Sequence, residues 1–99
     1  MLTGKQRAAL RSEANGIETI FQIGKGGIDD ALTQGVGAAL ATRELIKLRV
    51  LDNSEFSARE ACTQICSALC AEPIQVIGSR FVIYKRNDEI NAFKDILAF

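Results

Sequence analysis

The sequence contains no histidine, and this absence bears first on chemistry. Histidine is the most common general base in enzymes and the most common metal ligand, so a chain without it has little to offer for catalysis or metal binding. The paired carboxylates, Asp29-Asp30 and Asp88-Glu89, are adjacent in sequence and are typical of helix starts rather than of an acid/base pair. We therefore expect a protein that is not an enzyme and that uses no metal, cofactor or small-molecule substrate.

Long hydrophobic runs are also missing. No apolar run approaches the ~20 residues of a membrane span, and the N-terminus becomes polar at once, without the apolar stretch and cleavage site of a secretory signal. Cysteine is scarce: Cys62, Cys66 and Cys70 fall within one short window, which is not the spacing of a disulfide framework. These observations predict reduced thiols, a cytoplasmic location and no membrane partner.

The chain also has no excess of charge of either sign. The 12 Lys and Arg residues balance the 12 Asp and Glu residues, so the formal net charge is zero. Overall charge therefore gives no support for a polyanionic partner such as nucleic acid. Any such prediction must come from how the charges are distributed along the fold.

The residues that are present describe an ordinary globular domain. With 47% hydrophobic and 24% charged residues, a chain of 99 residues can bury a core as one compact domain. The expected elements follow from capping residues and from the spacing of apolar positions. In chain order they are a helix over 4–14, a strand over 17–23, a helix from 29 to about 43, a strand over 45–51, a helix from 57 that Pro73 ends, and strands over 74–77 and 81–85.

Short motifs support these boundaries. The segments Thr3–Gln6 and Ser57–Glu60 have the spacing of capping boxes, and Asp29 is a good N-cap for the second helix. Asn15-Gly16 is expected to supply the left-handed residue that closes the first helix. Gly78-Ser79 suits the first two positions of a type II′ turn, which makes the last two strands antiparallel neighbours.

The order α-β-α-β-α-β-β predicts an α/β fold. Strands that alternate with helices need crossover connections, whereas the final pair forms a hairpin, so the four-stranded sheet is mixed and helices cover at least part of it. In the strand over 45–51, alternation places Ile46, Leu48 and Val50 on one face. In the third helix, the cysteines interleave with Ile65 and Leu69, which indicates core thiols rather than metal ligands.

The stretch over 23–28, Ile-Gly-Lys-Gly-Gly-Ile, places three glycines around Lys25 between a strand and a helix start. Unpaired amides and the helix dipole favour an anion there, and glycine lets a phosphate approach the backbone. A phosphate-binding loop is one interpretation, and a tight turn that needs positive φ is the other. Neither a Walker A loop nor a complete dinucleotide fingerprint is present. Asp29 and Asp30 would repel a phosphate unless the fold holds them aside.

Other cations lie in three groups. Arg7 and Arg11 are one turn apart on the first helix, a like-charge pair that is easier to explain if an anion lies opposite, and Lys5 is nearby. Lys47 and Arg49 project together from the polar face of a strand. The third group, Arg80, Lys85 and Arg86, lies at the two ends of the last strand. A solvated surface explains these groups equally well, so the first two are candidate contacts only.

Together these stretches resemble a CRM domain, the chloroplast RNA splicing and ribosome maturation family, and specifically its stand-alone bacterial YhbY-type members. The resemblance spans about residues 2–86, and its motifs occur in the order and spacing of the family. The matching stretches are Leu2-Thr3-Gly4-Lys5-Gln6-Arg7, Ile23-Gly24-Lys25-Gly26-Gly27, Glu44-Leu45-Ile46-Lys47-Leu48-Arg49-Val50, and Val76-Ile77-Gly78 with Val82-Ile83-Tyr84-Lys85.

The resemblance implies a compact α/β domain similar to the C-terminal domain of translation initiation factor three, with a GxxG loop like that of KH domains, which clamps backbone nucleotides. It also implies that the partner is RNA, namely ribosomal RNA on precursors of the large ribosomal subunit. Carried onto this sequence, the phosphate contacts are Gly24, Lys25, Gly26 and Gly27. Candidate supporting contacts, assigned from their charge, are Lys5, Arg7, Arg11, Lys47 and Arg49.

The sequence departs from the family pattern in three ways. Asn15 stands where family members often have a histidine, the chain is neutral where they are typically basic, and nothing after Arg86 matches. We therefore divide the chain into a CRM domain over 1–86 and a tail over 87–99, in which Asp88 could cap a helix. An alternative function is a protein interaction module that docks on a ribosome precursor without direct RNA contact.

Overall fold

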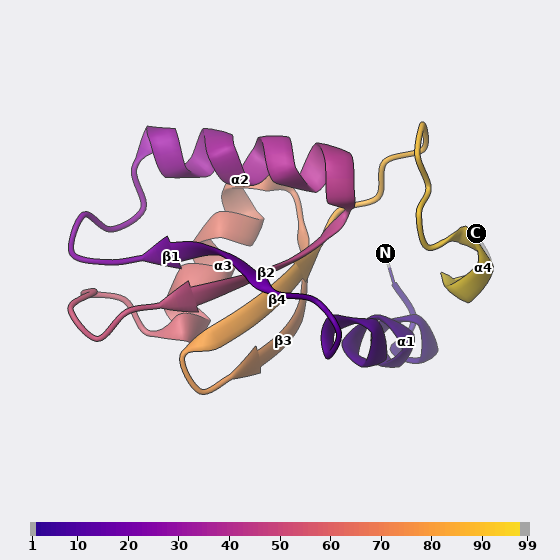
Figure 1. Cartoon of the computed structure of the whole chain (residues 1–99), viewed down its shortest axis with the longest axis horizontal. Helices are drawn as coiled ribbons and strands as arrows, with labels where there is room; N and C mark the ends of the chain where they lie inside the picture. The colour runs from indigo at the N-terminus through magenta and orange to yellow at the C-terminus, as the bar shows by residue number, and fades with distance from the viewer. Residues whose placement is uncertain (1, 98–99) are drawn as a thin grey trace.

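The structure is a computed structural model that describes residues 2–97. The described residues form a sheet with helices on both sides (Figure 1). In chain order the elements are α1 (Gly4–Ala14), β1 (Thr19–Ile23), α2 (Asp30–Arg43), β2 (Leu45–Val50), α3 (Ala58–Leu69), β3 (Glu72–Ile77), β4 (Arg80–Tyr84) and α4 (Lys94–Leu97). None of the described helices has the length and apolar character needed to cross a membrane.

The strands form one mixed sheet in the order β1-β2-β4-β3. β1 lies parallel to β2, whereas β4 is antiparallel to both β2 and β3. This arrangement confirms the predicted α/β fold class and the mixed four-stranded sheet. Gly78 and Ser79 join β3 to β4, and the φ of 58° at Gly78, with no positive φ at Ser79, fits the predicted hairpin turn.

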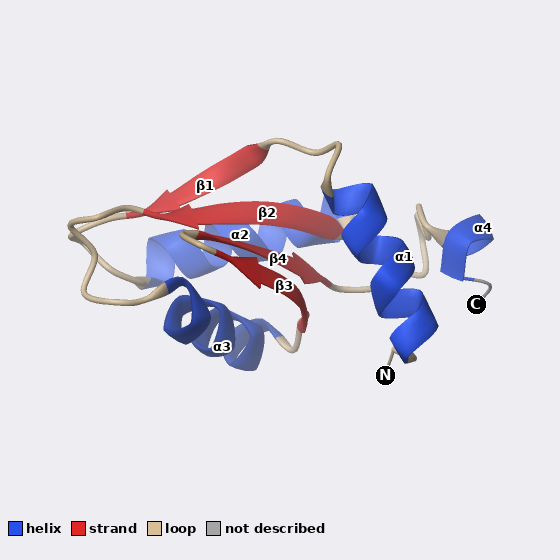
Figure 2. Ribbon diagram, turned by 90° about the horizontal axis from the view of Figure 1, so that it is seen from below, coloured by secondary structure: helices blue, strands red, loops and turns tan. Residues whose placement is uncertain are grey.

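The two faces of the sheet are covered unequally (Figure 2). Helices α2 and α3 cover one face over the main core, to which β2 contributes Ile46, Leu48 and Val50, as predicted. Helix α1 packs against the other face at one end only, in a smaller core that includes Leu10 and Tyr84. We call the uncovered remainder of that second face the open face. Its side chains include Gln22, Lys47, Arg49, Gln75, Ile77 and Arg80.

The predicted helix starts are confirmed. Thr3–Gln6 and Ser57–Glu60 both form complete capping boxes, in which each side chain accepts the backbone amide of the other residue. At the start of α2, the Asp29 carboxylate accepts the Leu32 amide at 2.8 Å. These caps satisfy amides that a helix cannot bond internally, so the local sequence sets where each helix begins.

Two predicted helix ends are wrong. Neither Asn15 nor Gly16 has positive φ; their amides donate instead to carbonyls three residues back, at 3.3 and 3.1 Å, which satisfies the end of α1 without a left-handed residue. Pro73 does not end α3. That helix stops at Leu69 because Cys70 adopts a left-handed conformation with φ 57°, and Pro73 lies within the edge strand β3.

The cysteines of α3 divide between core and surface. Cys62 and Cys66 are buried in the main core, which confirms the prediction for these two, whereas Cys70 is exposed. The hydrogen bond with Cys62, together with burial, raises the pKa of the Cys66 thiol. All three thiols are free, and no group of three acidic, cysteine or histidine side chains in residues 2–97 could hold a metal ion.

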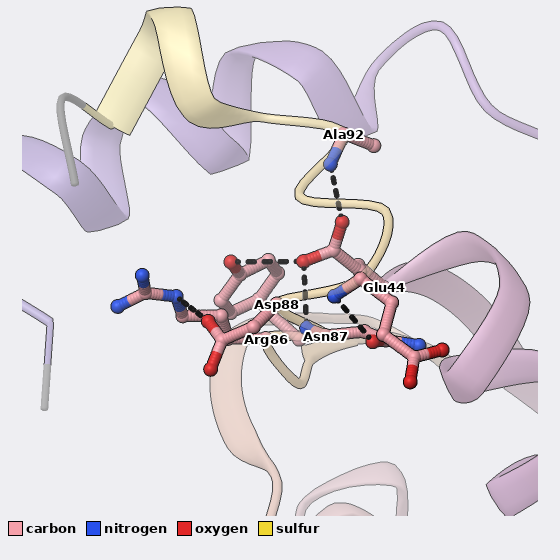
Figure 3. A network of polar contacts seen from close by, with 7 residues as sticks. Glu44, Arg86, Asn87, Asp88 and Ala92 are labelled. Carbon is pink, nitrogen blue, oxygen red and sulfur yellow. Dashed lines mark hydrogen bonds and ion pairs between the residues drawn. The ribbon is translucent and has the colours of Figure 1, made fainter.

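A buried carboxylate fixes the segment that follows β4 (Figure 3). Glu44, between α2 and β2, is fully buried and has a φ of 63°. One carboxylate oxygen accepts the Asn87 amide at 2.9 Å and the Tyr84 hydroxyl at 3.4 Å, and the other accepts the Ala92 amide. The Glu44 carbonyl accepts the Lys85 amide at 2.9 Å. One residue therefore anchors the chain where it leaves the sheet.

Beyond that anchor the chain packs onto α1. The rings of Phe93 and Tyr84 meet edge to face, with centroids 6.2 Å apart. Leu97 is buried in the smaller core, and its carbonyl accepts the Gln6 side-chain amide at 2.9 Å. Asp88, which could have capped a helix, instead forms an ion pair with Arg86 at 2.7 Å, and α4 begins only at Lys94.

Candidate functional site

The glycine-rich stretch forms a turn at the end of the sheet away from α1 (Figures 1 and 2). We call Gly24–Gly27 the glycine turn; it connects the end of β1 to the residues before α2. The Gly27 amide donates to the Gly24 carbonyl at 3.0 Å and closes the turn. The Leu51 amide donates to the Ile23 carbonyl at 2.8 Å, which ties the turn to the end of β2.

The need for a tight turn explains only part of the glycine content. Gly27 has a φ of 69°, which favours glycine, and a side chain at Gly24 would come within 3.3 Å of Asn53 Oδ1. Gly26 is different: its φ is not positive, and a side chain there would meet no heavy atom within 4 Å. The fold therefore does not require glycine at position 26. A ligand that approaches the backbone closely would require it.

The glycine turn presents its outer amides to solvent. Lys25 and Gly26 are exposed, and neither of their amides donates to any group in the part of the chain that the structure describes. Free amides beside a lysine, between a strand and the N-terminal end of a helix, are groups that favour an anion such as phosphate. The geometry is the one that the phosphate-binding interpretation of the sequence needs.

The aspartates that follow the turn do not oppose this arrangement equally. The Asp29 carboxylate is bonded to the Leu32 amide, so its charge is directed at the start of α2. Asp30 is exposed in the first turn of that helix, where a negative charge complements the helix dipole. The N-cap bond thus holds the nearer carboxylate aside.

The sheet continues the site with cations. Lys47 and Arg49 lie on the open face of β2, as predicted, and Arg49 pairs in register with Gln22, two positions before the glycine turn begins. On the other side of β2, Arg49 lies opposite Arg80 of β4. The fold therefore brings three cations together on the strands that lead away from the turn.

The cations of α1 lie elsewhere. Lys5, Arg7 and Arg11 belong to the helix at the opposite end of the molecule, so the structure does not bring them to the glycine turn (Figure 2). The Arg7 guanidinium pairs with the Glu72 carboxylate and donates to the Pro73 carbonyl. The like charges of Arg7 and Arg11 predicted an anion opposite them, and the Glu72 carboxylate is such an anion within the chain itself. Lys5 and Arg11 are exposed.

Sequence reasoning did not assign several residues around Lys47 to the site. A hollow of about 140 Å³ opens on the open face between the end of α1 and the β3–β4 hairpin, and its polar lining is Asn15, Lys47, Gln75 and Arg80. The hairpin turn alone pairs Arg80 with Ile77, which the sequence could have revealed. It could not reveal that β4 lies beside β2, because that pairing is set by the packing of the whole sheet.

The fold and the site together define a small α/β domain with a solvent-facing GxxG turn at one end of a partly open sheet. The chain belongs to the CRM domain family, because the CRS1 / YhbY (CRM) domain matches residues 2–85. The resemblance seen in the sequence motifs is thereby confirmed.

Two relatives extend this comparison. The "Probable RNA-binding protein YqeI" of Bacillus subtilis (strain 168) is 40% identical over 89 residues, which cover 90% of this chain and 93% of the relative. The solution structure of SAV1595 from Staphylococcus aureus, described as "a putative RNA binding protein", matches with a TM-score of 0.74 and 46% identity. That match covers 88% of this chain and 91% of the other.

Proposed function

We propose that this protein binds RNA and holds the backbone of ribosomal RNA through the glycine turn. The observation that carries the proposal is the pair of unbonded amides at Lys25 and Gly26, presented at a position where the fold does not require glycine. The family and the names of its relatives support RNA as the anion. In this function Gly24, Lys25, Gly26 and Gly27 contact phosphate oxygens.

The cations form two supporting groups of unequal weight. Arg49 lies near the glycine turn through the β1–β2 register, and Lys47 precedes it by two residues on β2; both would contact neighbouring phosphates of the same strand. Lys5 and Arg11 would contact a more distant part of a folded RNA. Arg7 would contribute least, because its guanidinium must first leave Glu72.

The biological setting is also part of the proposal. We propose that the RNA lies on a precursor of the large ribosomal subunit and that the protein acts in the cytoplasm, where its three free thiols would stay reduced. Residues 1–86 would form the RNA-binding domain. The segment from 87 onward would support it, since its described part packs on α1 and Glu44 rather than projecting outward.

The test is the salt dependence of RNA binding. Each phosphate that a protein neutralises contributes about 0.7–0.9 to the slope of log affinity against log salt concentration. Lys25→Ala should weaken binding to naked ribosomal RNA and lower that slope by about this amount. Titrations by filter binding or fluorescence anisotropy at several salt concentrations measure both quantities.

A matched control is Lys85→Ala, which removes an exposed lysine at the opposite end of β4. It should leave the slope nearly unchanged. The proposal is wrong if Lys25→Ala binds ribosomal RNA like the parent at every salt concentration, or if Lys85→Ala lowers the slope as much.

A protein interaction module is the alternative, and exposed apolar side chains favour it. Ile77 on the open face is 63% exposed and Ile90 is 45% exposed. Deleting the segment from 88 onward would be a poor test, because Leu97 belongs to the smaller core. Ile90→Ser is a cleaner variant. If it abolishes association with ribosome precursors while binding to naked RNA persists, the result supports the protein interaction module and contradicts recruitment by direct RNA binding.

A further inference from the structure

The open face carries positive charge that the protein itself does not neutralise. Among the strand residues of this second face the only carboxylate is Glu72, at the α1 end, where it pairs with Arg7. None of the three open-face cations, Lys47, Arg49 and Arg80, forms an ion pair within the described residues. In a chain of zero net charge, this uncompensated group is a local feature that complements an anion.

Two structural details indicate that these cations lower the stability of the protein when no ligand is bound. Arg49 and Arg80 are directly opposite on antiparallel strands, and like charges in that position destabilise a sheet. In addition, Arg49 Nε is buried and has no hydrogen-bond partner in the part of the chain that the structure describes. An anion between the two guanidinium groups would remove the repulsion and supply an acceptor.

The adjoining hollow is lined by both apolar and amide-bearing residues. Its volume is about 140 Å³, and its apolar lining includes the buried Val82 and Ile77, which the fold leaves largely exposed. Asn15 and Gln75, which carry side-chain amides, also line it. Each amide has a donor and an acceptor side by side, which is the pattern that nucleobase edges match.

The polarity of the hollow gives a bound nucleotide one orientation. Asn15 caps the C-terminal end of α1, the negative end of the helix dipole, which repels a phosphate. The cations Arg49 and Arg80 lie toward the β3–β4 turn and the glycine turn. The phosphate therefore belongs beside the arginines and the base beside Asn15.

The hollow is also within reach of a strand held at the glycine turn. Arg49 is level with Gln22, and the glycine turn begins two positions after Gln22. An unpaired strand held at the turn can direct a neighbouring base toward the sheet. A base in an A-form duplex keeps its pairing edge occupied and cannot enter.

We propose that this hollow is a subsite for one unpaired nucleotide of the bound RNA, with Arg49 and Arg80 on its phosphate and the amides of Asn15 and Gln75 on the edge of its base. The subsite rests on the proposed RNA-binding function and adds a preference for single-stranded or looped RNA and a dependence on base identity. Lys47, on the side of the hollow, contributes charge rather than base selection.

The experiment compares the full chain on four homopolymeric RNA oligonucleotides of equal length and on a fully paired RNA duplex of that length. The parent should prefer single strands and should discriminate among the four bases. Gln75→Ala combined with Asn15→Ala removes no charge. It should reduce the affinity ratio between the best and worst homopolymer by roughly five- to hundredfold and leave the salt slope unchanged.

Two further variants separate charge from base recognition. Arg80→Gln should lower the salt slope by about 0.7, the single-strand value for one phosphate, without altering base preference. Gln64→Ala, on the solvent face of α3, is the matched amide control and should change neither quantity. Circular dichroism melts verify that each variant is folded. In the parent, the side-chain NH₂ resonances of Asn15 and Gln75 should shift on addition of the preferred oligonucleotide.

The outcomes distinguish the subsite from the function on which it rests. If RNA binds and Lys25→Ala weakens it, but the double amide variant keeps the base preference of the parent, the subsite is wrong and the proposed function stands. Preference for the duplex, or equal affinity for all four homopolymers, also overturns the subsite. If the parent binds no RNA at all, both proposals fail.

Discussion

The protein treats its polar groups in opposite ways at the two ends of its sheet. At the α1 end, the buried Glu44 carboxylate accepts bonds from Asn87, Ala92 and Tyr84, so a charge in the core is fully partnered (Figure 3). At the other end, the amides of Lys25 and Gly26 have no acceptor in residues 2–97. One end uses its polar groups to hold the fold together, and the other leaves them available to a ligand.

This difference shows two roles that polar groups can have in a small domain, one in stability and one in binding. A buried carboxylate without donors would be costly, so Glu44 is retained because several donors meet it. The exposed amides of Lys25 and Gly26 cost little in water, so the fold can leave them unpaired at no great loss of stability. Substitutions at the first end should therefore change stability, and substitutions at the second should change binding.

The largest expected effect is that of Glu44→Ala. It leaves two backbone amides and the Tyr84 hydroxyl without their acceptor, which should cost about 3 kcal/mol or more of unfolding free energy and lower Tm by more than about 10 °C. Thermal melts followed by circular dichroism measure the change. Glu89→Ala removes an exposed carboxylate from the same segment and serves as control. A Glu44→Ala protein that melts like Glu89→Ala would show that the network is not an anchor.

The second prediction compares two substitutions in the glycine turn, one expected to change stability and the other expected to change RNA binding. Gly27→Ala forces an alanine to φ 69° and should cost about 1–2 kcal/mol of stability. Gly26→Ala meets no atom of the protein and should leave stability unchanged, but its methyl group would hold a phosphate away from the amides and weaken RNA binding. Denaturant titration and RNA binding of both variants test the pair. If Gly26→Ala binds RNA like the parent, close backbone approach is not used.

The third prediction compares two arginines on α1. Arg7→Gln breaks the pair with Glu72 and should lower stability by up to ~1 kcal/mol, with little effect on the salt slope of RNA binding. Arg11→Gln, at an exposed position one turn on, should lower the slope by more than Arg7→Gln and leave stability nearly unchanged. The reverse ranking of the two slopes would place RNA against the Glu72 side of α1.

The smallest effect concerns the one tyrosine. Burial and the neighbouring Glu44 carboxylate raise the pKa of Tyr84 to about 12. Because the folded state favours the neutral phenol, its contribution to stability is complete below the unfolded pKa of about 10 and is lost as pH rises through about 12. Tyr84 is the only tyrosine, so ultraviolet absorbance of tyrosinate reports it alone. A native midpoint near 10 would mean that the hydroxyl is not held in the Glu44 network.

Much of the fold follows from local signals. The capping boxes at Thr3–Gln6 and Ser57–Glu60 and the cap at Asp29 mark helix starts through bonds that each segment makes with itself. Helix ends were less predictable. The α1 end closes with three-residue bonds and α3 ends at Cys70, because several chemically different closures satisfy the last carbonyls of a helix equally well.

The candidate site also has one part that local sequence predicts and one part that it does not. The glycine turn, with Lys25 at its tip, was predictable because glycines between a strand and a helix act within one short segment. The contacts around Lys47 were not, since Asn15, Gln75 and Arg80 come from three other elements. The engagement of Arg7 by Glu72, 65 residues away along the chain, was equally hidden.

By itself the sequence determined the element order, the helix starts, the strand faces and the glycine turn, because each depends on residues within a few positions of one another. Only the tertiary structure decided that Arg49 faces Arg80, that Glu44 lies buried beneath the C-terminal segment, and that α1 leaves part of one sheet face open. Strand order and register minimise the free energy of the whole core at once, and no local pattern records that minimum.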